Sequence, residues 1–488
     1  MSPKRLKIIT AGVMLSLFLA SMEGTVVATA MPSIVAQLGG LSIYSWVFSI
    51  YMLASTTTVP IYGKLSDVFG RKKVYLISMS LFLVGSILCG FANSMQQLIF
   101  FRAIQGLGAG GVLPLALIII GEIYSVEERA RMQGYFSGVW GVSSIIGPLI
   151  GGFLVDQISW HWVFFINLIP GIIAVSLVLI AWNNQPKFMR RDVKLDFIGA
   201  ILLTLSALSL LLGLNQLESP FGVWSLLAAI LLFIGLLIVE KKVEDPILPL
   251  HMFRDRLFSI AILHGVLSGW AMFGSISYVP LFVQAVLGTS ATIAGITLTP
   301  MSLIWTVASI LGSWMLLKIS FRSVAVIGTV FLVIGCYFLT TINMGTSQIL
   351  VMIYTSLMGI GMGLTIPVFL ISIQTFAAKR DLGVATSTIQ FSRSIGGTLG
   401  VSVLGVVLSS RLSTLLLQAG SDPSGISLNS LINPIPGNSA AIDLPLRQAL
   451  GTSMANMFLV SFIAAVLSLI VVFFTPKGKL VSSKIAED

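Results

Sequence analysis

One acidic residue stands inside a segment that is otherwise apolar enough to cross a membrane. The segment is SLFLASMEGTVVATAMPSI, residues 16–34, and its acid is Glu23. A charged side chain at the centre of a bilayer costs roughly 3 kcal/mol on insertion scales, so an ionisable residue there indicates a function. Removal from water favours the protonated form of a carboxyl group. Glu23 can therefore carry a proton near neutral pH or, once ionised, bind a cation. The alternative is a carboxyl group that a hydrogen bond keeps neutral, buried and inert.

Two arginines and one histidine also lie inside apolar segments. An unpaired guanidinium in lipid is expensive, so Arg102 should face the interior of a helix bundle. There it can tune Glu23, if the two approach closely, or hydrogen-bond helix ends and backbone carbonyls. Arg393 can bind an anionic group or a carbonyl of a ligand, or simply reach a polar neighbour. For His264 we favour a hydrogen-bonded core position over a proton carrier.

The sequence GKLSDVFGRKK lies between two apolar segments and combines one acid with four basic residues. Gly63 would permit close helix packing, and Gly70 would permit a tight turn. Asp67 can face a helix N-terminus, where a negative charge is favoured, or pair with Arg71. The alternative is a solvated basic loop that only sets the membrane topology.

The elements that must position these residues are membrane-spanning helices. Of the 488 residues, 56% are hydrophobic and 9% are charged, and the mean hydropathy is +0.99. A soluble protein carries roughly 25% charged residues, so most of this surface must face lipid. Cys89 and Cys336 fall inside apolar runs and provide neither a disulfide framework nor the spacing of metal ligands.

Apolar stretches of about 18–25 residues mark helical spans, and we predict fourteen of them. The alternating segments of a membrane β-barrel are absent from the sequence. The predicted spans cover approximately 8–31, 44–62, 74–92, 98–121, 133–155, 163–182, 196–214, 223–239, 257–286, 293–317, 323–342, 348–377, 383–410 and 454–474.

The basic residues set the orientation of these spans. All but four of the 28 Lys and Arg fall in segments that lie on one side of the membrane if both termini are cytoplasmic. Cytoplasmic segments of membrane proteins carry this excess of Lys and Arg. We therefore predict a multi-pass protein of the plasma or inner membrane with both termini cytoplasmic. The net charge of +10 follows from this topology and does not indicate a nucleic-acid partner.

The chain contains an internal repeat. GLGAGGVLP begins at Gly106 and GIGMGLTIP begins at Gly359, with glycines at matching offsets and a final proline in each. GYFSGVWGVSSIIGPLIG, from Gly134, likewise matches GVATSTIQFSRSIGGTLG, from Gly383. The copies are eight predicted helices apart, and this even offset gives both copies the same orientation. The pattern is the parallel repeat of a transporter built from two halves.

The repeat predicts an all-α polytopic membrane protein with two six-helix halves. The N-terminal half covers residues 1–183, and two inserted helices with flanking cytoplasmic linkers cover 184–256. The C-terminal half covers 257–488. It includes an extracytoplasmic loop at about 411–453 that is rich in Ser, Asn, Pro and Gly.

Nucleotide binding is not supported by the sequence. GLGAGG fits the G-x-G-x-x-G pattern of dinucleotide sites, but it lies inside a span with no strand before it. No G-x-x-x-x-G-K-[ST] motif occurs, so direct use of ATP by this chain is unsupported. We predict no cofactor, no metal and no enzymatic activity, with a proton gradient as the source of energy.

The motifs together resemble a known family. GKLSDVFGRKK is similar to the loop 2–3 signature of the major facilitator superfamily, and the surrounding segments resemble its fourteen-span drug:proton antiporter family. The resemblance implies the major facilitator fold, with two inserted helices and a substrate site near the midplane between the halves. The segments that carry it are MEGTVVATAMP from Met22, SWVFSIYMLA from Ser45, RAIQGLGAGG from Arg102, GVSSIIGPLIGG from Gly141 and SWHWVFFINLIPG from Ser159.

The resemblance implies roles for individual residues. It implies proton transfer at Arg102, with Glu23 standing where the family usually has Asp. It also implies that Glu122 joins Asp67 and Arg71 in a charge cluster that locks the outward-open state. We assign to the substrate cavity Trp46, Tyr51, Gln105 and Arg393. We assign to conformational gating Gly63, Asp67, Gly70, Arg71, Glu122, Gly141, Gly147, Pro148 and Gly151.

We favour a secondary active transporter that exports amphipathic drugs or dyes, often cationic, in exchange for protons. Such multidrug efflux would confer antibiotic resistance. Proton and substrate would compete for Glu23 while rocking of the halves exposes the site to each side in turn. The partners would be small amphipathic molecules, protons and membrane lipid. The alternatives are proton-coupled export of an endogenous lipid, siderophore or metabolite, and a membrane sensor that does not transport.

Overall fold

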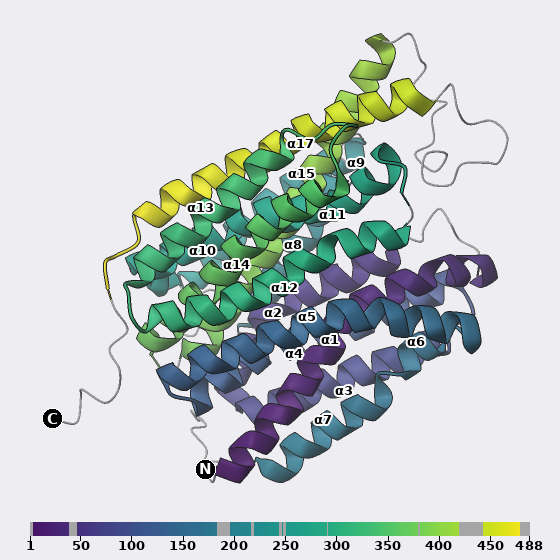
Figure 1. Cartoon of the computed structure of the whole chain (residues 1–488). Coiled ribbons are helices and arrows are strands. Elements are labelled where there is room, and N and C mark those ends of the chain that lie inside the picture. Colours follow the sequence, from purple (N-terminus) through teal and green to yellow (C-terminus); the bar gives the residue numbers. More distant parts are fainter. Residues whose placement is uncertain are drawn as a thin grey trace.

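The computed structural model describes residues 3–38, 46–182, 196–215, 219–243, 246, 250–289, 291–378, 381–418 and 443–478. Over these residues the protein is helical and contains no strand. The long helices run side by side as one bundle (Figure 1). The start of α1 (Pro3–Leu38) and the end of α17 (Asp443–Phe473) lie at the same end of this bundle. We call it the Asp67 end, because α2 returns to it at Asp67.

The helices follow the order of the predicted spans. The N-terminal half continues with α2 (Trp46–Phe69), α3 (Arg71–Gly90), α4 (Met95–Ile123), α5 (Val126–Gln157), α6 (Trp162–Phe165) and α7 (Leu168–Ala181). The central part contains α8 (Phe197–Asn215), α9 (Pro220–Glu240) and the 3₁₀ helix η2 (Leu250–Arg254). The C-terminal half contains α10 (Arg256–Gly269), the π-helix η3 (Trp270–Gly274), α11 (Ser275–Leu281), the π-helix η4 (Phe282–Val286), α12 (Ala291–Leu316), α13 (Phe321–Leu339), α14 (Gln348–Phe376), α15 (Leu382–Gln418) and α17.

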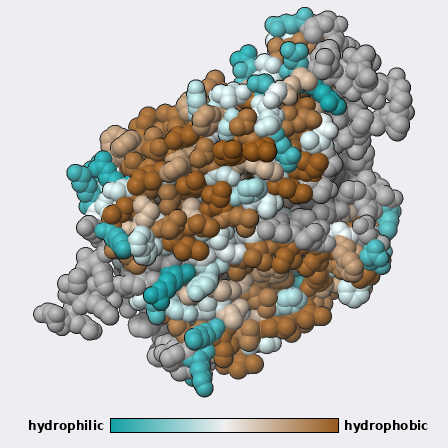
Figure 2. Space-filling view, in the orientation of Figure 1, coloured by the Kyte–Doolittle hydropathy of each residue, from teal (hydrophilic) through white to brown (hydrophobic). Residues whose placement is uncertain are grey.

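Apolar side chains cover the flank of the bundle. Figure 2 shows hydrophobic residues over the middle of the visible face and hydrophilic residues toward its ends. Ile180 is 77% exposed and Trp224 is 70% exposed. Large exposed apolar surfaces mark membrane or protein contacts. Within the described residues, eleven helices are long and apolar enough to cross a membrane.

The predicted spans coincide with helices, but two predictions need comment. The helices α2, α5 and α8 are not among the eleven, so the count of fourteen crossings stays a prediction. The predicted loop at 411–453 is too long at both ends, because α15 continues to Gln418 and α17 begins at Asp443. Hydropathy marks the lipid-embedded part of a helix, whereas its backbone hydrogen bonds continue beyond that part. Residues 419–442 of the loop lie outside the described residues.

The repeated glycines make matching contacts in the two halves. A Cβ at Gly106 in α4 would lie 2.6 Å from the backbone oxygen of Tyr51 in α2. A Cβ at Gly359 in α14 would lie 2.7 Å from the backbone oxygen of Met301 in α12. In each half, therefore, a glycine at the same repeat position lets two helices pack backbone against backbone.

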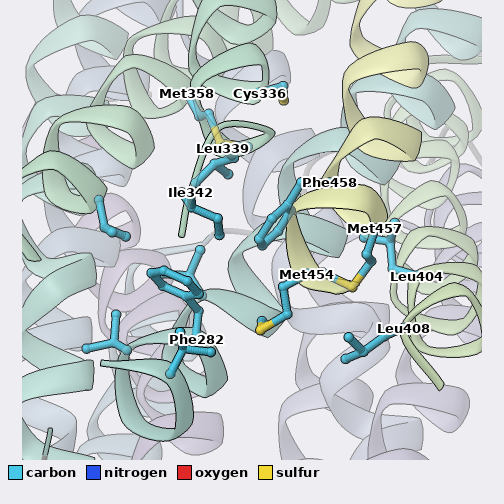
Figure 3. Packing of buried hydrophobic residues seen from close by; sticks show 14 of the residues in the cluster. Phe282, Cys336, Leu339, Ile342, Met358, Leu404, Leu408, Met454, Met457 and Phe458 are labelled. Atoms are coloured by element: carbon cyan, nitrogen blue, oxygen red, sulfur yellow. The ribbon is translucent and has the colours of Figure 1, made fainter. Parts of the chain in front are cut away.

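The C-terminal half has an apolar core of its own. The core lies where η4 meets α17, and Figure 3 shows Phe282 among Ile342, Met454 and Phe458. These four side chains are at most 3% exposed. All residues of this cluster come from η3 through α17, so its packing holds the C-terminal half together without using the N-terminal half.

We expect glycine contacts within a half to be intolerant of a single methyl group. In α4, a Cβ at Gly108 would overlap the backbone nitrogen of Phe82 and lie 2.7 Å from the oxygen of Ser78. Gly108→Ala should therefore destabilise the protein by roughly 1–3 kcal/mol, the cost of overpacking, seen as a lower unfolding temperature in detergent. Gly235→Ala in α9 is the control, because no heavy atom lies within 4 Å of its Cβ position. Equal unfolding temperatures for the two variants would contradict this account.

Candidate functional site

A carboxylate and a guanidinium meet inside the N-terminal half. Nη1 of Arg102 in α4 lies 2.6 Å from Oε1 of Glu23 in α1. Each side chain is 1% exposed, so protein surrounds the pair. Each charge compensates the other in a setting where either charge alone would be costly. The sequence offered this approach of the two residues as one of two possibilities for Arg102, and the fold provides it.

Arg102 also contacts groups other than Glu23. Its Nε donates to the backbone oxygen of Val47 at 3.2 Å, and its Nη1 also donates to Oε1 of Gln105 at 2.9 Å. The ring of Tyr51 covers the guanidinium, with its centroid 4.1 Å from Cζ, in a cation–π contact. Tyr51 and Gln105, both assigned to the substrate cavity, thus belong to the charge network. Trp46, assigned with them, is half-buried at the start of α2.

Asn167 supports the other oxygen of Glu23. Its Nδ2 donates to Oε2 of Glu23 at 2.7 Å and to Oγ of Ser86 at 3.0 Å. Asn167 lies in the break between α6 and α7. Pro170 accounts for this break, because proline has no N–H to donate to the carbonyl of Ile166 four residues earlier. Sequence analysis gave Asn167 no role, although an amide beside a proline in an apolar segment was a usable signal.

Two atoms of this network lack hydrogen-bond partners among the described residues. They are the donor Nε2 of Gln105 and the acceptor Oδ1 of Asn167. Buried polar groups are nearly always paired, so such atoms call for an explanation. A spare donor and a spare acceptor around Glu23 give the network capacity to form a second arrangement of hydrogen bonds.

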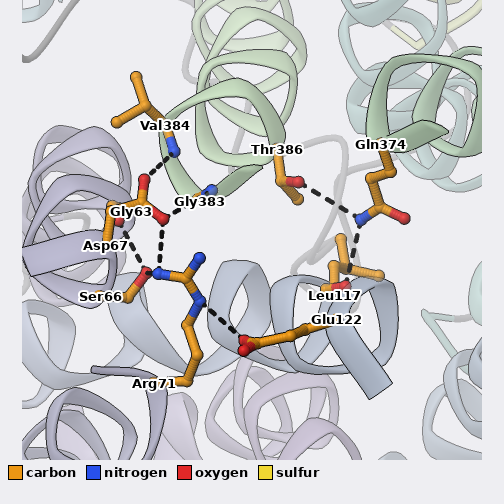
Figure 4. A network of polar contacts seen from close by, with 10 residues as sticks. All are labelled: Gly63, Ser66, Asp67, Arg71, Leu117, Glu122, Gln374, Gly383, Val384 and Thr386. Carbon is orange, nitrogen blue, oxygen red and sulfur yellow. Dashed lines mark hydrogen bonds and ion pairs between the residues drawn. The ribbon is translucent and has the colours of Figure 1, made fainter. Parts of the chain in front are cut away.

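A second polar network joins the two halves at the Asp67 end (Figure 4). The carboxylate of Asp67 accepts hydrogen bonds from the backbone N–H of Gly383 at 3.0 Å and of Val384 at 2.9 Å. These groups begin α15, and a helix N-terminus favours a negative charge. Nη1 of Arg71 lies 2.5 Å from Asp67, and its Nε lies 3.1 Å from Oε2 of Glu122. The sequence offered Asp67 either a helix N-terminus or Arg71, and the structure provides both.

Two glycines shape this network. A Cβ at Gly63 would overlap Oγ of Ser387 and lie 2.8 Å from the oxygen of Gly383, so α2 and α15 are in close contact. Gly70 has a φ of 89° in the turn between α2 and α3, a conformation that favours glycine. The predicted close packing at Gly63 and the tight turn at Gly70 are confirmed. Sequence analysis did not foresee that Gly63 packs against the other half.

Gln374 in α14 adds a contact that the sequence did not reveal. Its Nε2 donates to the backbone oxygen of Leu117 in α4 at 3.1 Å and to Oγ1 of Thr386 at 3.3 Å. Arg129 of α5 donates to the backbone oxygen of Gln374 at 3.4 Å. Gln374 is 6% exposed. A buried amide near the end of an apolar helix was the only available signal.

The first part of α5 faces the C-terminal half. A Cβ at Gly134 would lie 2.6 Å from Ile310 in α12, and one at Gly141 would lie 2.9 Å from Oγ1 of Thr306. Thr306 donates to the backbone oxygen of Ser137 at 2.9 Å. Together with the contacts of Asp67 and Gln374, these hydrogen bonds join the two halves on the Asp67 side of the bundle.

The later part of α5 faces its own half. A Cβ at Gly147 would overlap Oγ1 of Thr25, two residues after Glu23 in α1. Gly151 is buried, and the side chain of Pro148 lies outside the described residues. The helix α5 therefore contacts the helix of Glu23 at one point and the opposite half at another.

Arg393 lies apart from both networks, inside the C-terminal half. It is 8% exposed and donates to Oε1 of Gln390, three residues earlier in the same helix. His264 is buried, with Nε2 3.1 Å from Oγ1 of Thr329, which confirms the predicted hydrogen-bonded core position. Among the described residues, no group of His, Cys, Asp and Glu could hold a metal ion.

Comparisons with known proteins agree on the family. The profile of the Major Facilitator Superfamily matches residues 13–401. The multidrug transporter protein MdtP of Bacillus subtilis is 37% identical over 99% of this chain and 95% of its own length. Multidrug resistance protein 3 of the same organism is 37% identical over 97% of this chain and 96% of its own length. The solved structure of the proton:xylose symporter XylE has the same fold, with a TM-score of 0.67 at 13% identity and 98% coverage of both chains.

We expect the pair of Glu23 and Arg102 to show strong energetic coupling. Glu23→Gln or Arg102→Gln alone leaves an uncompensated buried charge, at a cost of roughly 3–5 kcal/mol. The double variant leaves two neutral amides and should recover part of that loss, which thermal unfolding of the four proteins in detergent would measure. The control is the same double-mutant cycle at Arg71 and Glu122. The side chain of Glu122 is 48% exposed, so the coupling energy of this pair should be about 0–1 kcal/mol. Additive losses at Glu23 and Arg102 would contradict direct pairing.

We expect Asp67 to hold the two halves together at this end. Asp67→Ala leaves the N–H groups of Gly383 and Val384 without their acceptor, which costs roughly 1–3 kcal/mol in the closed arrangement. Spin labels at Lys73 and Leu317, both exposed, would report the separation of the halves by distance measurement in nanodiscs.

The expected result for Asp67→Ala is a new population at longer distance. Glu122→Ala is the matched control, because its exposed carboxylate contributes little and the native distances should remain. Identical distance distributions for the two variants would show that Asp67 does not hold this end closed.

Proposed function

We propose that this chain, which belongs to the Major Facilitator Superfamily, exports amphipathic drugs or dyes, often cationic, in exchange for protons. The family consists of transporters, which confirms the prediction that the chain is not an enzyme. Two relatives at 37% identity carry multidrug names, and this similarity over nearly the full chain supports small amphipathic substrates. The observation that carries the proposal is the buried ion pair of Glu23 and Arg102.

We propose the topology that this function requires. The chain would cross the membrane fourteen times with both termini cytoplasmic, as two six-helix halves with α8 and α9 inserted between them. The fourteen predicted spans and the excess of Lys and Arg on one side support this arrangement. The Asp67 end is then the cytoplasmic end, and the contacts between the halves seal it.

A proton would act by competing with Arg102 for Glu23. An O–H bond at Oε1 or Oε2 cancels the charge of Glu23, while the Arg102 guanidinium keeps its own protons and its charge. The 2.6 Å ion pair then loses its electrostatic stabilisation. A half-turn of the Asn167 amide would offer its spare Oδ1 to the new O–H, because the amide carries a donor and an acceptor. The network thus has partners for both protonation states.

A cationic substrate would compete for the same carboxylate. In this structure Arg102 is the cation that Glu23 holds, so substrate, proton and Arg102 are three alternatives for one negative charge. The sequence predicted competition between proton and substrate for Glu23, and the ion pair supports adding Arg102 as a third competitor. Aromatic Tyr51, which now covers the guanidinium, could cover a substrate cation through the same cation–π contact.

The packing offers a route from the charge site to the interface between the halves. The helix α1 carries Glu23 and contacts α5 at Gly147, where the Thr25 side chain occupies the position that a Cβ of residue 147 would take. The same helix α5 meets α12 of the other half at Gly134 and Gly141. A shift of α1 after protonation would be passed to α5 by direct contact, because none of the three glycine contacts leaves room for a methyl group.

Gradient-driven transport by the reconstituted protein tests the proposal. In inside-out vesicles with an acidic interior, the native chain should accumulate ethidium, and Glu23→Gln should lose gradient-driven accumulation by at least about tenfold, as for removal of an essential proton carrier. Exchange of labelled for unlabelled ethidium without a gradient separates loss of coupling from loss of folding. Full proton-driven accumulation by Glu23→Gln would contradict the role of Glu23.

The control is Asp255→Asn, the same change from carboxylate to amide at the N-cap of α10. Asp255 caps that helix by accepting from the N–H of Phe258 at 2.9 Å, and asparagine caps helices equally well. This variant should transport like the native chain. Failure of the native chain to move any amphipathic dye would instead support a non-transporting sensor, and uptake of a single native compound would support a dedicated exporter.

A further inference from the structure

The C-terminal half contains a buried arginine that forms no ion pair with any acidic residue among the described parts of the chain. Arg393 is 8% exposed in α15. The sequence contains no Asp or Glu at residues 256–380 or 382–421, which include α10, α14 and α15. The helix α15 also packs against α2 and α4, whose acids Asp67 and Glu122 pair with Arg71. The acidic residue of α17 is Asp443, which begins the helix. The helix α17 begins at the end of the bundle opposite the Asp67 end. Arg102, the buried arginine of the other half, has Glu23 instead.

The protein partner of Arg393 is neutral. Its Nη2 donates to Oε1 of Gln390, and this bond uses one of the five N–H groups of a guanidinium. An amide oxygen does not neutralise the charge. A buried charge that lacks a countercharge is costly, and ionisable residues within membrane-spanning helices usually mark binding sites.

Arg393 lines a small cavity between α10, α14 and α15. The cavity has about 10 Å³ of room for the centre of a water molecule, which is close to the minimum for one buried water. Its polar lining consists of Arg393, His264, Ser268 and Thr365, each at most 8% exposed, and apolar residues such as Phe369 complete it. The space fits one atom of the size of a water oxygen, such as one oxygen of a carboxylate. A chloride ion is larger and fits once the flexible Arg393 side chain moves outward.

Ser268 is a donor that can turn toward such an atom. Its Oγ lies 3.5 Å from the backbone oxygen of Gly265 and 3.5 Å from Nδ1 of His264, both at the limit of a hydrogen bond. Thr365, in contrast, is committed to the backbone oxygen of Gly361 at 3.0 Å. The weakly held hydroxyl and the charged guanidinium therefore line the same space.

Two glycines hold α10 against Arg393. A Cβ at Gly269 would overlap the backbone oxygen of Arg393, and a Cβ at Gly265 would lie 3.5 Å from its Cγ. The π-helix η3 begins at the next residue, Trp270. Single π-helical turns are frequent at functional sites. The wall of the cavity is thus made by close backbone contact within one half.

We propose that the Arg393 cavity binds a single negatively charged atom, either a free chloride ion or an anionic oxygen of a substrate. The second source rests on the proposed transport function, whereas the first does not. The anion supplies the countercharge that the C-terminal half lacks, and Arg393 and Ser268 donate to it. A substrate with a cationic and an anionic group would then use Glu23 in one half and Arg393 in the other.

The purified full chain in detergent tests both sources. In the first experiment, sodium chloride replaces sodium gluconate at constant ionic strength, and the unfolding temperature is measured. In the second, fluorescence anisotropy measures the binding of two probes. One is a rhodamine that carries a free carboxylate, and the other is the methyl ester of the same rhodamine. If chloride is the ligand, it should raise the unfolding temperature of the native chain but not of Arg393→Gln.

If the ligand is a substrate oxygen, the native chain should prefer the free carboxylate, and Arg393→Gln should lose about tenfold of this preference, as expected for a charge-assisted hydrogen bond. Arg411→Gln, an exposed arginine of the same helix, is the matched control and should behave like the native chain. Ser268→Ala keeps the charge and should weaken the same response by a smaller factor, which covers the case that Arg393→Gln does not fold.

The proposal is overturned if the native chain, Arg393→Gln and Ser268→Ala show the same chloride response and the same ratio of carboxylate to ester binding. If the native chain binds neither rhodamine, this result would count against the proposed transport function. The chloride response alone would then decide whether the site exists. Binding of the ester with an unchanged ratio in all variants would leave the transport function standing and remove the site.

Discussion

A charge inside a helix bundle in a membrane must find its partner within the bundle, and the N-terminal half is arranged around this constraint. Glu23 on α1 and Arg102 on α4 form a pair that is 1% exposed. The backbone of α2 accepts from Arg102, and the break between α6 and α7 brings Asn167 to Glu23. The helices α1, α2 and α4 and the break between α6 and α7 therefore converge on one pair of charges, and a change in either charge must alter contacts with several helices.

Contacts between the halves include polar hydrogen bonds in addition to the close glycine packing that is also found within each half. Within a half, glycines bring backbones together and apolar clusters fill the remaining space, as at Gly106 and around Phe282. Between the halves, close glycine contacts such as that of Gly63 are joined at the Asp67 end by polar bonds, where a carboxylate meets the N-terminus of α15. Polar bonds exchange readily for bonds to water, whereas a packed core does not. This difference suits two stable halves that separate and close as units.

The two halves share a repeat but not their charges. Aligning Pro32 with Pro280 sets Ala271 opposite Glu23, and Ala271 lies buried in η3. Arg393, in turn, occupies the position of Ser144 in the repeat. One half thus carries a balanced pair, and the other carries an arginine with a neutral amide partner. Under the proposed function, this asymmetry would present a substrate with a carboxylate in one half and a guanidinium in the other.

Much of this protein follows from the sequence by itself. Apolar runs determined the helices, because lipid requires every backbone group to be satisfied within its own segment. The rarity of charges in those runs identified Glu23, Arg102 and Arg393, and the spacing of glycines identified the repeat. Only the tertiary structure decided which charges meet. Glu23 and Arg102 are 79 residues apart and Asp67 and Gly383 are 316 apart, and no local pattern records a contact across such distances. Asn167 and Gln374 received no predicted role, since a buried amide gains its role from the atoms that the fold sets beside it.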